Sequence, residues 1–258
     1  MGSFANVLID RVQIGKSIQG RSKCDFCGYI LSWFDNIPII SFLIIKGRCR
    51  KCHRKLSWQY PLMEVLMGLI FVLTFWLIQK NQLFQVSNFN FESFFIAFYY
   101  FFVAYILWVI LVWDLKYMII PDFLVLIGIV GTFIFQIYLT VNAGFLMGLE
   151  NNLISALLGG LVVSGFFGFL FYISKGKWIG GGDVKLGFWL GLMVGFKMTY
   201  FLLLFSYVFG AVVSVFLLLF FKKKMKSQIP FGPFLIISTY VIIFSRDLIL
   251  EIWNNLII

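Results

Sequence analysis

Residues 180–183 read Gly-Gly-Gly-Asp and stand at the start of an apolar run, residues 184–196. An aspartate at the centre of a membrane span costs roughly 2.5–3.5 kcal/mol on insertion scales, so such an acid is seldom without a function. Asp114 has a similar setting, because it directly follows the apolar run 94–113. A flexible loop with a helix-capping acid would also explain the first stretch alone. Together, the two stretches predict that Asp114 and Asp183 form one site.

The composition is that of an integral membrane protein. Of the 258 residues, 61% are hydrophobic and 12% are charged, and the mean hydropathy is +0.96. Long apolar runs favour helices over a β-barrel, whose strands would alternate. We therefore predict an all-α polytopic membrane protein with about seven to eight transmembrane helices, the first of them a partial helix at residues 1–9. The other predicted spans are residues 61–78, 94–112, 119–141, 153–173, 184–196, 200–221 and 229–245.

The basic residues predict the orientation of these spans. With residues 10–60 in the cytoplasm, 18 of the 21 Lys and Arg residues fall in cytoplasmic loops, and only Lys80, Lys197 and Arg246 lie outside. Such a split is a strong positive-inside signal. Two predicted spans separate Asp114 from Asp183, so both acids face the cytoplasm. The net charge of +10 is thus explained by topology, and nucleic acid is not an expected partner.

Residues 10–60 are the one hydrophilic insert, and they contain two Cys-x-x-Cys pairs. Four thiolates satisfy tetrahedral zinc and leave no open position for water, so we predict a structural, zinc-ribbon-like site. Two disulfides are the alternative, which a cytoplasmic location opposes. The domains expected are thus residues 1–9, 10–60 and a membrane domain at 61–258. The predicted zinc ligands are Cys24, Cys27, Cys49 and Cys52.

Other polar residues near these segments leave alternatives open. Glu64 lies one turn into the helix that begins at Pro61, where it either complements the helix dipole or serves as a functional acid in a cytoplasmic cavity. His53 directly follows Cys52 and is expected to be an exposed neighbour rather than a ligand. Basic residues beside the cysteines could hold anionic lipid head groups. They are Lys46, Arg48, Arg50, Lys51, Arg54 and Lys55.

Nearly the whole chain resembles the type IV prepilin peptidases, which are membrane aspartyl proteases of the GxGD class. The similarity rests on an ordered set of motifs rather than on one. In this family an apolar half-helix usually precedes the first motif, so we expect the first helix to be partial. The motifs are residues 2–11 (Gly-Ser-Phe-Ala-Asn-Val-Leu-Ile-Asp-Arg), the cysteine pairs, Asn36-Ile37-Pro38 with Ser41, residues 47–50 (Gly-Arg-Cys-Arg), residues 60–64 (Tyr-Pro-Leu-Met-Glu), Asp114 with Ile120-Pro121-Asp122, residues 180–186, and residues 230–234 (Pro-Phe-Gly-Pro-Phe).

The resemblance implies an enzyme of the inner or plasma membrane that cuts the short basic leader from prepilins or pseudopilins. Asp114 and Asp183 would be catalytic, with Gly180, Gly181, Gly182, Asp122 and Lys185 close by. Many members then methylate the new N-terminus with S-adenosylmethionine. On that analogy, Gly47 and Arg48 belong to the methyltransfer site, although no nucleotide-binding signature is visible in the sequence.

Two nearby carboxylates cannot both ionise freely, so we expect the acids to share a proton. The ionised member would take a proton from water, and the protonated member would polarise the scissile carbonyl and later protonate the leaving amine. An ion- or proton-coupled transporter that uses Asp114 and Asp183 is the alternative. It leaves the cysteine insert unexplained, and a non-catalytic scaffold leaves the acids unexplained.

Overall fold

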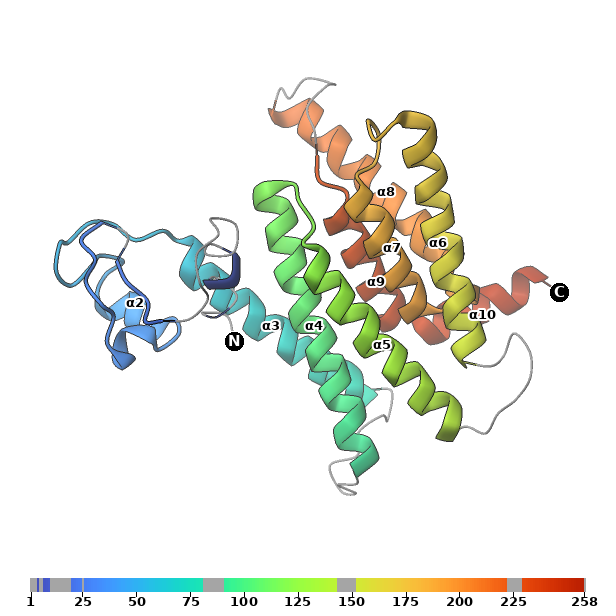
Figure 1. Cartoon of the computed structure of the whole chain (residues 1–258), viewed down its shortest axis with the longest axis horizontal. Coiled ribbons are helices and arrows are strands. Elements are labelled where there is room, and N and C mark those ends of the chain that lie inside the picture. Colours follow the sequence, from blue (N-terminus) through green and yellow to red (C-terminus); the bar gives the residue numbers. More distant parts are fainter. Residues whose placement is uncertain are drawn as a thin grey trace. The chain divides into compact units, whose positions relative to one another are not determined.

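A computed structural model describes residues 4, 7–9, 20–24, 26–80, 91–142, 152–221 and 229–257. The chain divides into two compact units, Met1–Val109 and Ile110–Ile258. The described part is built from helices, with only two isolated β-bridges and no strand (Figure 1). The all-α prediction is therefore confirmed. Most of the predicted partial first helix falls outside the described residues, and so do all the lysines that follow residue 221, Lys222, Lys223, Lys224 and Lys226, which were assigned to a cytoplasmic loop.

The cysteine segment of the first unit is compact but has little regular structure. Each Cys-x-x-Cys pair forms a tight turn that a short bridge closes, Lys23 with Ile30 and Arg48 with Lys55. Two short helices connect these turns, the 3-10 helix η1 (Trp33–Asn36) and α2 (Ile40–Ile44). The segment leads directly into α3 (Gln59–Lys80), which begins two residues before Pro61. Proline is tolerated there because the first turn of a helix has no partner for its N–H.

The helices after the cysteine segment correspond one by one to the predicted spans. Five of them are long and apolar enough to cross a membrane, whereas α7 and α9 are too short to do so as straight helices. Sequence analysis did not predict α10, the last helix. The remaining bounds are α4 (Phe91–Tyr117), α5 (Asp122–Asn142), α6 (Asn152–Ser174), α7 (Gly181–Val194), α8 (Phe196–Phe221), α9 (Gly232–Phe244) and α10 (Arg246–Ile257).

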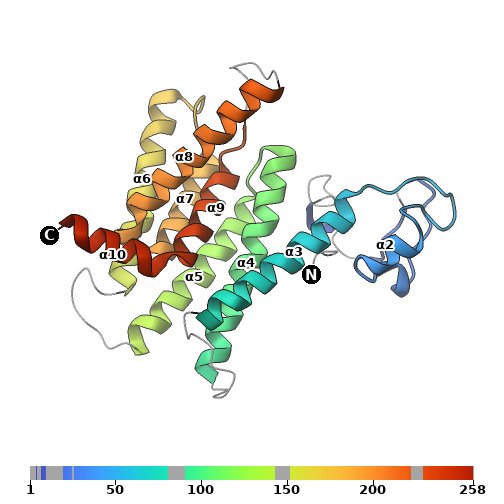
Figure 2. The same ribbon diagram turned by 180° about the vertical axis from the view of Figure 1, so that it is seen from behind.

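Helix α7 is the centre of the second unit. It packs against α5, α6, α8 and α9, and both ribbon views show it enclosed by these helices (Figures 1 and 2). Leu186, Trp189, Leu190 and Leu192 have no exposed surface. A 14-residue helix surrounded by protein need not match the thickness of the bilayer, since its neighbours rather than lipid cover it. Its burial explains why this run was short and rich in glycine.

Small residues allow this close packing. Gly159 of α6 and Gly191 of α7 lie backbone against backbone, and neither position has room for a Cβ atom. On the other side, the indole Nε1–H of Trp189 donates a buried hydrogen bond of 2.8 Å to Oγ1 of Thr132 on α5. Glycine contacts and side-chain hydrogen bonds are the usual means of helix association in membranes, where apolar burial gives little gain. In this unit, such contacts fix the position of α7 along its axis relative to α5 and α6.

Candidate active site

Asp183 occupies the third position of α7, and its carboxylate caps that helix. Gly180 donates its backbone N–H to Oδ2 of Asp183 at 3.1 Å, and the N–H of Asp183 returns to the carbonyl of Gly180 at the same distance. A carboxylate at this position also complements the positive end of the helix dipole. The side chain is nevertheless buried, and its second oxygen, Oδ1, has no hydrogen-bond partner. Capping thus occupies only Oδ2 of Asp183 and leaves Oδ1 without a partner.

Asp114 lies in the last turn of α4. The N–H of Met118 donates to the carbonyl of Asp114 at 2.8 Å, and Met118 has a φ of 55°, which ends the helix. The carboxylate is buried, with 4% of the residue exposed, and the backbone N–H of Gly232 acts on it as a hydrogen-bond donor. Its Oδ2 atom is buried without a hydrogen-bond partner among the described residues.

The two acids meet at one end of the second unit. Asp183 is close enough to Asp114 to interact with it electrostatically. Ile120 connects their surroundings, because it lies against both Gly182, beside Asp183, and Gly232, beside Asp114. A Cβ on Gly182 would come within 2.9 Å of Ile120, and one on Gly232 within 2.5 Å of Oδ2 of Asp114. Glycine at both positions therefore allows this close approach.

The other residues predicted for this site differ in their placement. Gly180 and Gly182 take part as described, whereas a Cβ added at Gly181 would meet only the ring of Phe171, at 3.9 Å. Asp122 and Lys185 pair with each other at 2.7 Å, and both side chains are more than half exposed. The pair joins the start of α5 to the first turn of α7 beside the acids. Each residue of the pair has its charged partner in the other, so the pair is separate from the buried carboxylates of Asp114 and Asp183.

Sequence analysis missed the part that Gly232 and Ile120 play. The only available signal was the Pro-Phe-Gly-Pro-Phe motif at residues 230–234, which entered the sequence analysis as one of the family motifs. An aromatic wall also adjoins the site: Tyr207 of α8 interacts electrostatically with Asp183 and packs on Phe231 with ring centroids 5.4 Å apart. Apolar spacing in a transmembrane helix gave no sign of this contact. These groups enclose the acids in apolar surroundings.

The four cysteines converge in the first unit. Their Sγ atoms all lie within 4.8 Å of one another, and both Cys24–Cys52 and Cys27–Cys49 are 3.9 Å apart. A disulfide needs a sulfur–sulfur distance of about 2.05 Å, so the chain holds four free thiols. Four sulfurs around a tetrahedral zinc, at about 2.3 Å each, would be about 3.8 Å apart. The cluster could therefore hold a metal ion, and the exposed His53 is not part of it.

The electrostatics of the cluster also suit a cation. Backbone N–H groups of Cys52 and Lys51 lower the pKa of the Cys49 thiol to about 6. The Tyr29 backbone acts in the same direction on Cys27, but desolvation and the neighbouring thiols outweigh it and raise the pKa of Cys27 to about 11. Adjacent thiolates repel one another, so the four cysteines cannot all ionise readily by themselves, and a bound dication removes that repulsion.

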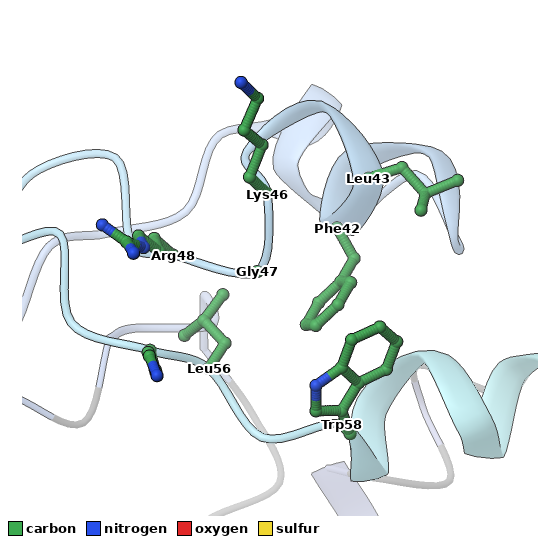
Figure 3. A pocket seen from close by; sticks show the side chains of 8 residues that line it. Phe42, Leu43, Lys46, Gly47, Arg48, Leu56 and Trp58 are labelled. Atoms are coloured by element: carbon green, nitrogen blue, oxygen red, sulfur yellow. The ribbon is translucent and has the colours of Figure 1, made fainter.

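Gly47 and Arg48 line a cavity of about 370 Å³ in the same unit (Figure 3). Gly47 has a φ of 65°, and a Cβ there would touch the ring of Phe42 at 3.0 Å. The Phe42 and Trp58 rings form one wall, with centroids 5.1 Å apart. Leu43, Lys46, Lys55 and Leu56 complete the lining.

Glu64 has a structural contact that neither sequence interpretation included. Its Oε2 accepts a 2.8 Å hydrogen bond from the backbone N–H of Ile39, which has a φ of 62°. A branched residue in that conformation is strained, so the contact helps to hold the turn before α2. Glu64 thereby ties the cysteine segment to the first turns of α3.

Comparisons with known proteins agree with this organisation. Residues 1–78 match the family model of the bacterial peptidase A24 N-terminal domain, and residues 101–215 match that of the type IV leader peptidase family. The chain is 30% identical to a prepilin leader peptidase/N-methyltransferase of Vibrio cholerae, over 95% of this chain and 92% of that protein. A protein of the same description from Aeromonas salmonicida is 28% identical over 88% of this chain and 72% of its own. No solved structure matches. The chain belongs to the type IV leader peptidase family.

Proposed function

We propose that the chain is a prepilin leader peptidase in which Asp114 and Asp183 form the catalytic pair. The observation that carries the proposal is that two helices bring their carboxylates together in apolar surroundings, each with one buried oxygen that lacks a partner. An unpartnered buried carboxylate oxygen is costly and calls for a functional reason. A water molecule and a peptide carbonyl are the partners that hydrolysis would supply.

The pair acts with one shared proton, because two adjacent carboxylates repel each other when both are ionised. The ionised carboxylate takes a proton from water, and the water oxygen attacks the scissile carbonyl carbon. The protonated carboxylate donates a hydrogen bond to the carbonyl oxygen and then gives a proton to the leaving amine as the C–N bond breaks. Gly180 and Gly232 hold the two side chains through their backbone N–H groups.

The substrates are prepilins or pseudopilins, whose short basic leader is cut at the cytoplasmic face of the cell membrane. Family membership supports the substrate class, since the relatives are described as prepilin leader peptidases. The basic loops that surround the acids support the location, because Lys116, Lys175, Lys177 and Lys185 lie at the same end of the second unit. The apolar segment of a prepilin would bring it there by partitioning into the bilayer.

The chain also methylates the new N-terminus, in keeping with the description of its relatives as N-methyltransferases. S-adenosylmethionine would supply the methyl group. The cavity beside Gly47 and Arg48 fits such a compound in size, and the Phe42 and Trp58 rings offer an apolar wall. Zinc on the four cysteines would hold the second knuckle, whose closing residues Arg48 and Lys55 line this cavity. The division into residues 1–9, 10–60 and 61–258 remains our prediction.

Co-expression with a prepilin tests the peptidase proposal. Asp114→Asn and Asp183→Asn should each lower cleavage by at least about 10²–10⁴-fold, the usual contribution of general acid–base catalysis. The mass of the pilin reports cleavage and methylation separately. Normal cleavage by either variant would refute the assignment. A transporter using the same acids is not favoured, because both halves of the chain match peptidase family models.

A further inference from the structure

One face of the cysteine segment is strongly apolar although it lies outside the membrane-spanning helices. Ile40, Leu43 and Ile44 of α2 are 56%, 63% and 67% exposed. Residues at positions i, i+3 and i+4 share one side of a helix. Phe42 is buried on the other side, where its ring contacts Trp58. The short helix therefore turns its most apolar side away from the core that it helps to build.

Trp58 adds an exposed ring beside this surface, because Leu43 and Trp58 border the same cavity. It is 73% exposed and directly precedes Gln59, the first residue of the membrane-spanning helix α3. We call the set Ile40, Leu43, Ile44 and Trp58 the α2 face. Tryptophan is enriched at the level of the lipid head groups, where its ring is half in apolar surroundings. The covalent link to α3 thus holds Trp58 close to the bilayer, and the hydrogen bond from the N–H of Ile39 to Glu64 of α3 holds the start of α2 against the same helix.

Positive charge surrounds the cavity that Leu43 and Trp58 border, and the structure sorts the basic residues of the segment into two groups. Arg50 binds Asp35 at 2.7 Å, and Arg54 lies over the Phe26 ring at 4.8 Å. By contrast, Lys46, Arg48 and Lys55 line the cavity that has the Phe42 and Trp58 rings as one wall, and the described residues provide no ion pair for them (Figure 3). No acidic residue lines this cavity.

We propose that the α2 face docks onto the anionic surface of the bilayer, with its four apolar side chains at the boundary between the head groups and the acyl chains. Lys46 and Lys55 then lie at the level of the lipid phosphates. Exposed apolar residues flanked by Lys and Arg are the usual pattern of interfacial anchors, and anionic lipids attract such basic groups. Docking would hold the Gly47 cavity at the membrane surface. The inference does not depend on the proposed peptidase chemistry.

Photo-crosslinking in nanodiscs tests the docking. The full chain, with benzoylphenylalanine in place of Ile44, is reconstituted with about 30% phosphatidylglycerol, an anionic lipid. We expect adducts that carry the mass of one phospholipid, at least about fivefold more than with the same probe in place of Phe26, which is 57% exposed on the first knuckle. Adducts with residues 110–258, with a second copy or with an added prepilin, in place of lipid, would overturn the proposal.

Hydrogen exchange of the unmodified chain gives a second measurement that needs no probe. Amides of residues 40–46 should exchange at least about threefold more slowly when phosphatidylglycerol replaces neutral lipid, because docking covers them. The double variant Lys46→Gln, Lys55→Gln should lose that dependence on charge. An unchanged exchange rate in the wild-type chain would contradict docking on anionic lipid.

Discussion

At the scale of single residues, the site depends on its glycines, which leave room because they lack a side chain, as much as on the two acids. Asp114 and Asp183 can approach because Gly182 and Gly232 leave room for Ile120 between the loops that carry them. Both acids also depend on backbone donors. The N–H of Gly180 donates to Asp183, and the N–H of Gly232 acts as a donor to Asp114. A side chain added at these glycines would therefore disturb the chemistry more than the fold.

Gly232→Ala should lower the rate of prepilin cleavage by about 10²-fold, since a displacement of about 1 Å at a catalytic group has that effect. The new Cβ would lie 2.5 Å from Oδ2 of Asp114 and would push the carboxylate aside. Gly210→Ala is the matched control, because its Cβ meets only ordinary contacts at 3.4–3.8 Å. Cleavage kinetics in detergent measure both. Equal rates for the two variants would show that Gly232 does not position Asp114.

Asp122→Asn should change the cleavage rate by less than about twofold. The exposed ion pair with Lys185 contributes at most about 1 kcal/mol to stability and touches neither buried carboxylate. The same assay should give a similar result for Lys185→Gln. A loss as large as that expected for Asp114→Asn would place Asp122 in the catalytic machinery instead.

At the scale of helices, the short α7 has the central position because its neighbours cover it. The contact between Gly159 and Gly191 brings α6 and α7 together, and the bond from Trp189 to Thr132 fixes α5 on the other side. Asp183 is at the start of this helix. Its depth therefore depends on packing along the whole of α7.

Gly191→Ala should destabilise the second unit by about 1–3 kcal/mol, the usual cost of an extra methyl group in a packed interior. The site faces the backbone of Gly159, which cannot move aside as a flexible side chain could. Gly165→Ala on α6 is the control, because no atom lies within 4 Å of its new Cβ. Thermal unfolding in detergent should show a lower melting temperature for the first variant only. Equal melting temperatures would contradict the close α6–α7 contact.

At the scale of the whole chain, two sites of different chemistry lie in two units. The carboxylates belong to Ile110–Ile258, and the thiols and the Gly47 cavity belong to Met1–Val109. The family models match the same two parts separately, which is consistent with two activities that can be separated by mutation.

Cys24→Ser should remove the metal and methylation while leaving cleavage within about twofold of wild type, because a structural site supports only the fold around it. Metal analysis should fall from about one zinc per chain to none, since three thiolates bind far more weakly than four. Ser22→Ala, in the same turn, should retain metal and both activities. Cleavage lost together with metal would show that the peptidase needs the cysteine segment.

The sequence was enough to predict the helical class, the approximate spans, the four-cysteine cluster and the meeting of Asp114 and Asp183, whose catalytic role stays a prediction. It could do so because apolar run length, cysteine spacing and a costly acid in a membrane helix are local properties. Three features came to light only in the folded chain: Gly232 lies beside Asp114, Asp122 pairs with Lys185, and α2 turns its apolar side outward. These contacts join residues that are far apart in the chain. They depend on how the helices pack, and no local sequence pattern shows that packing.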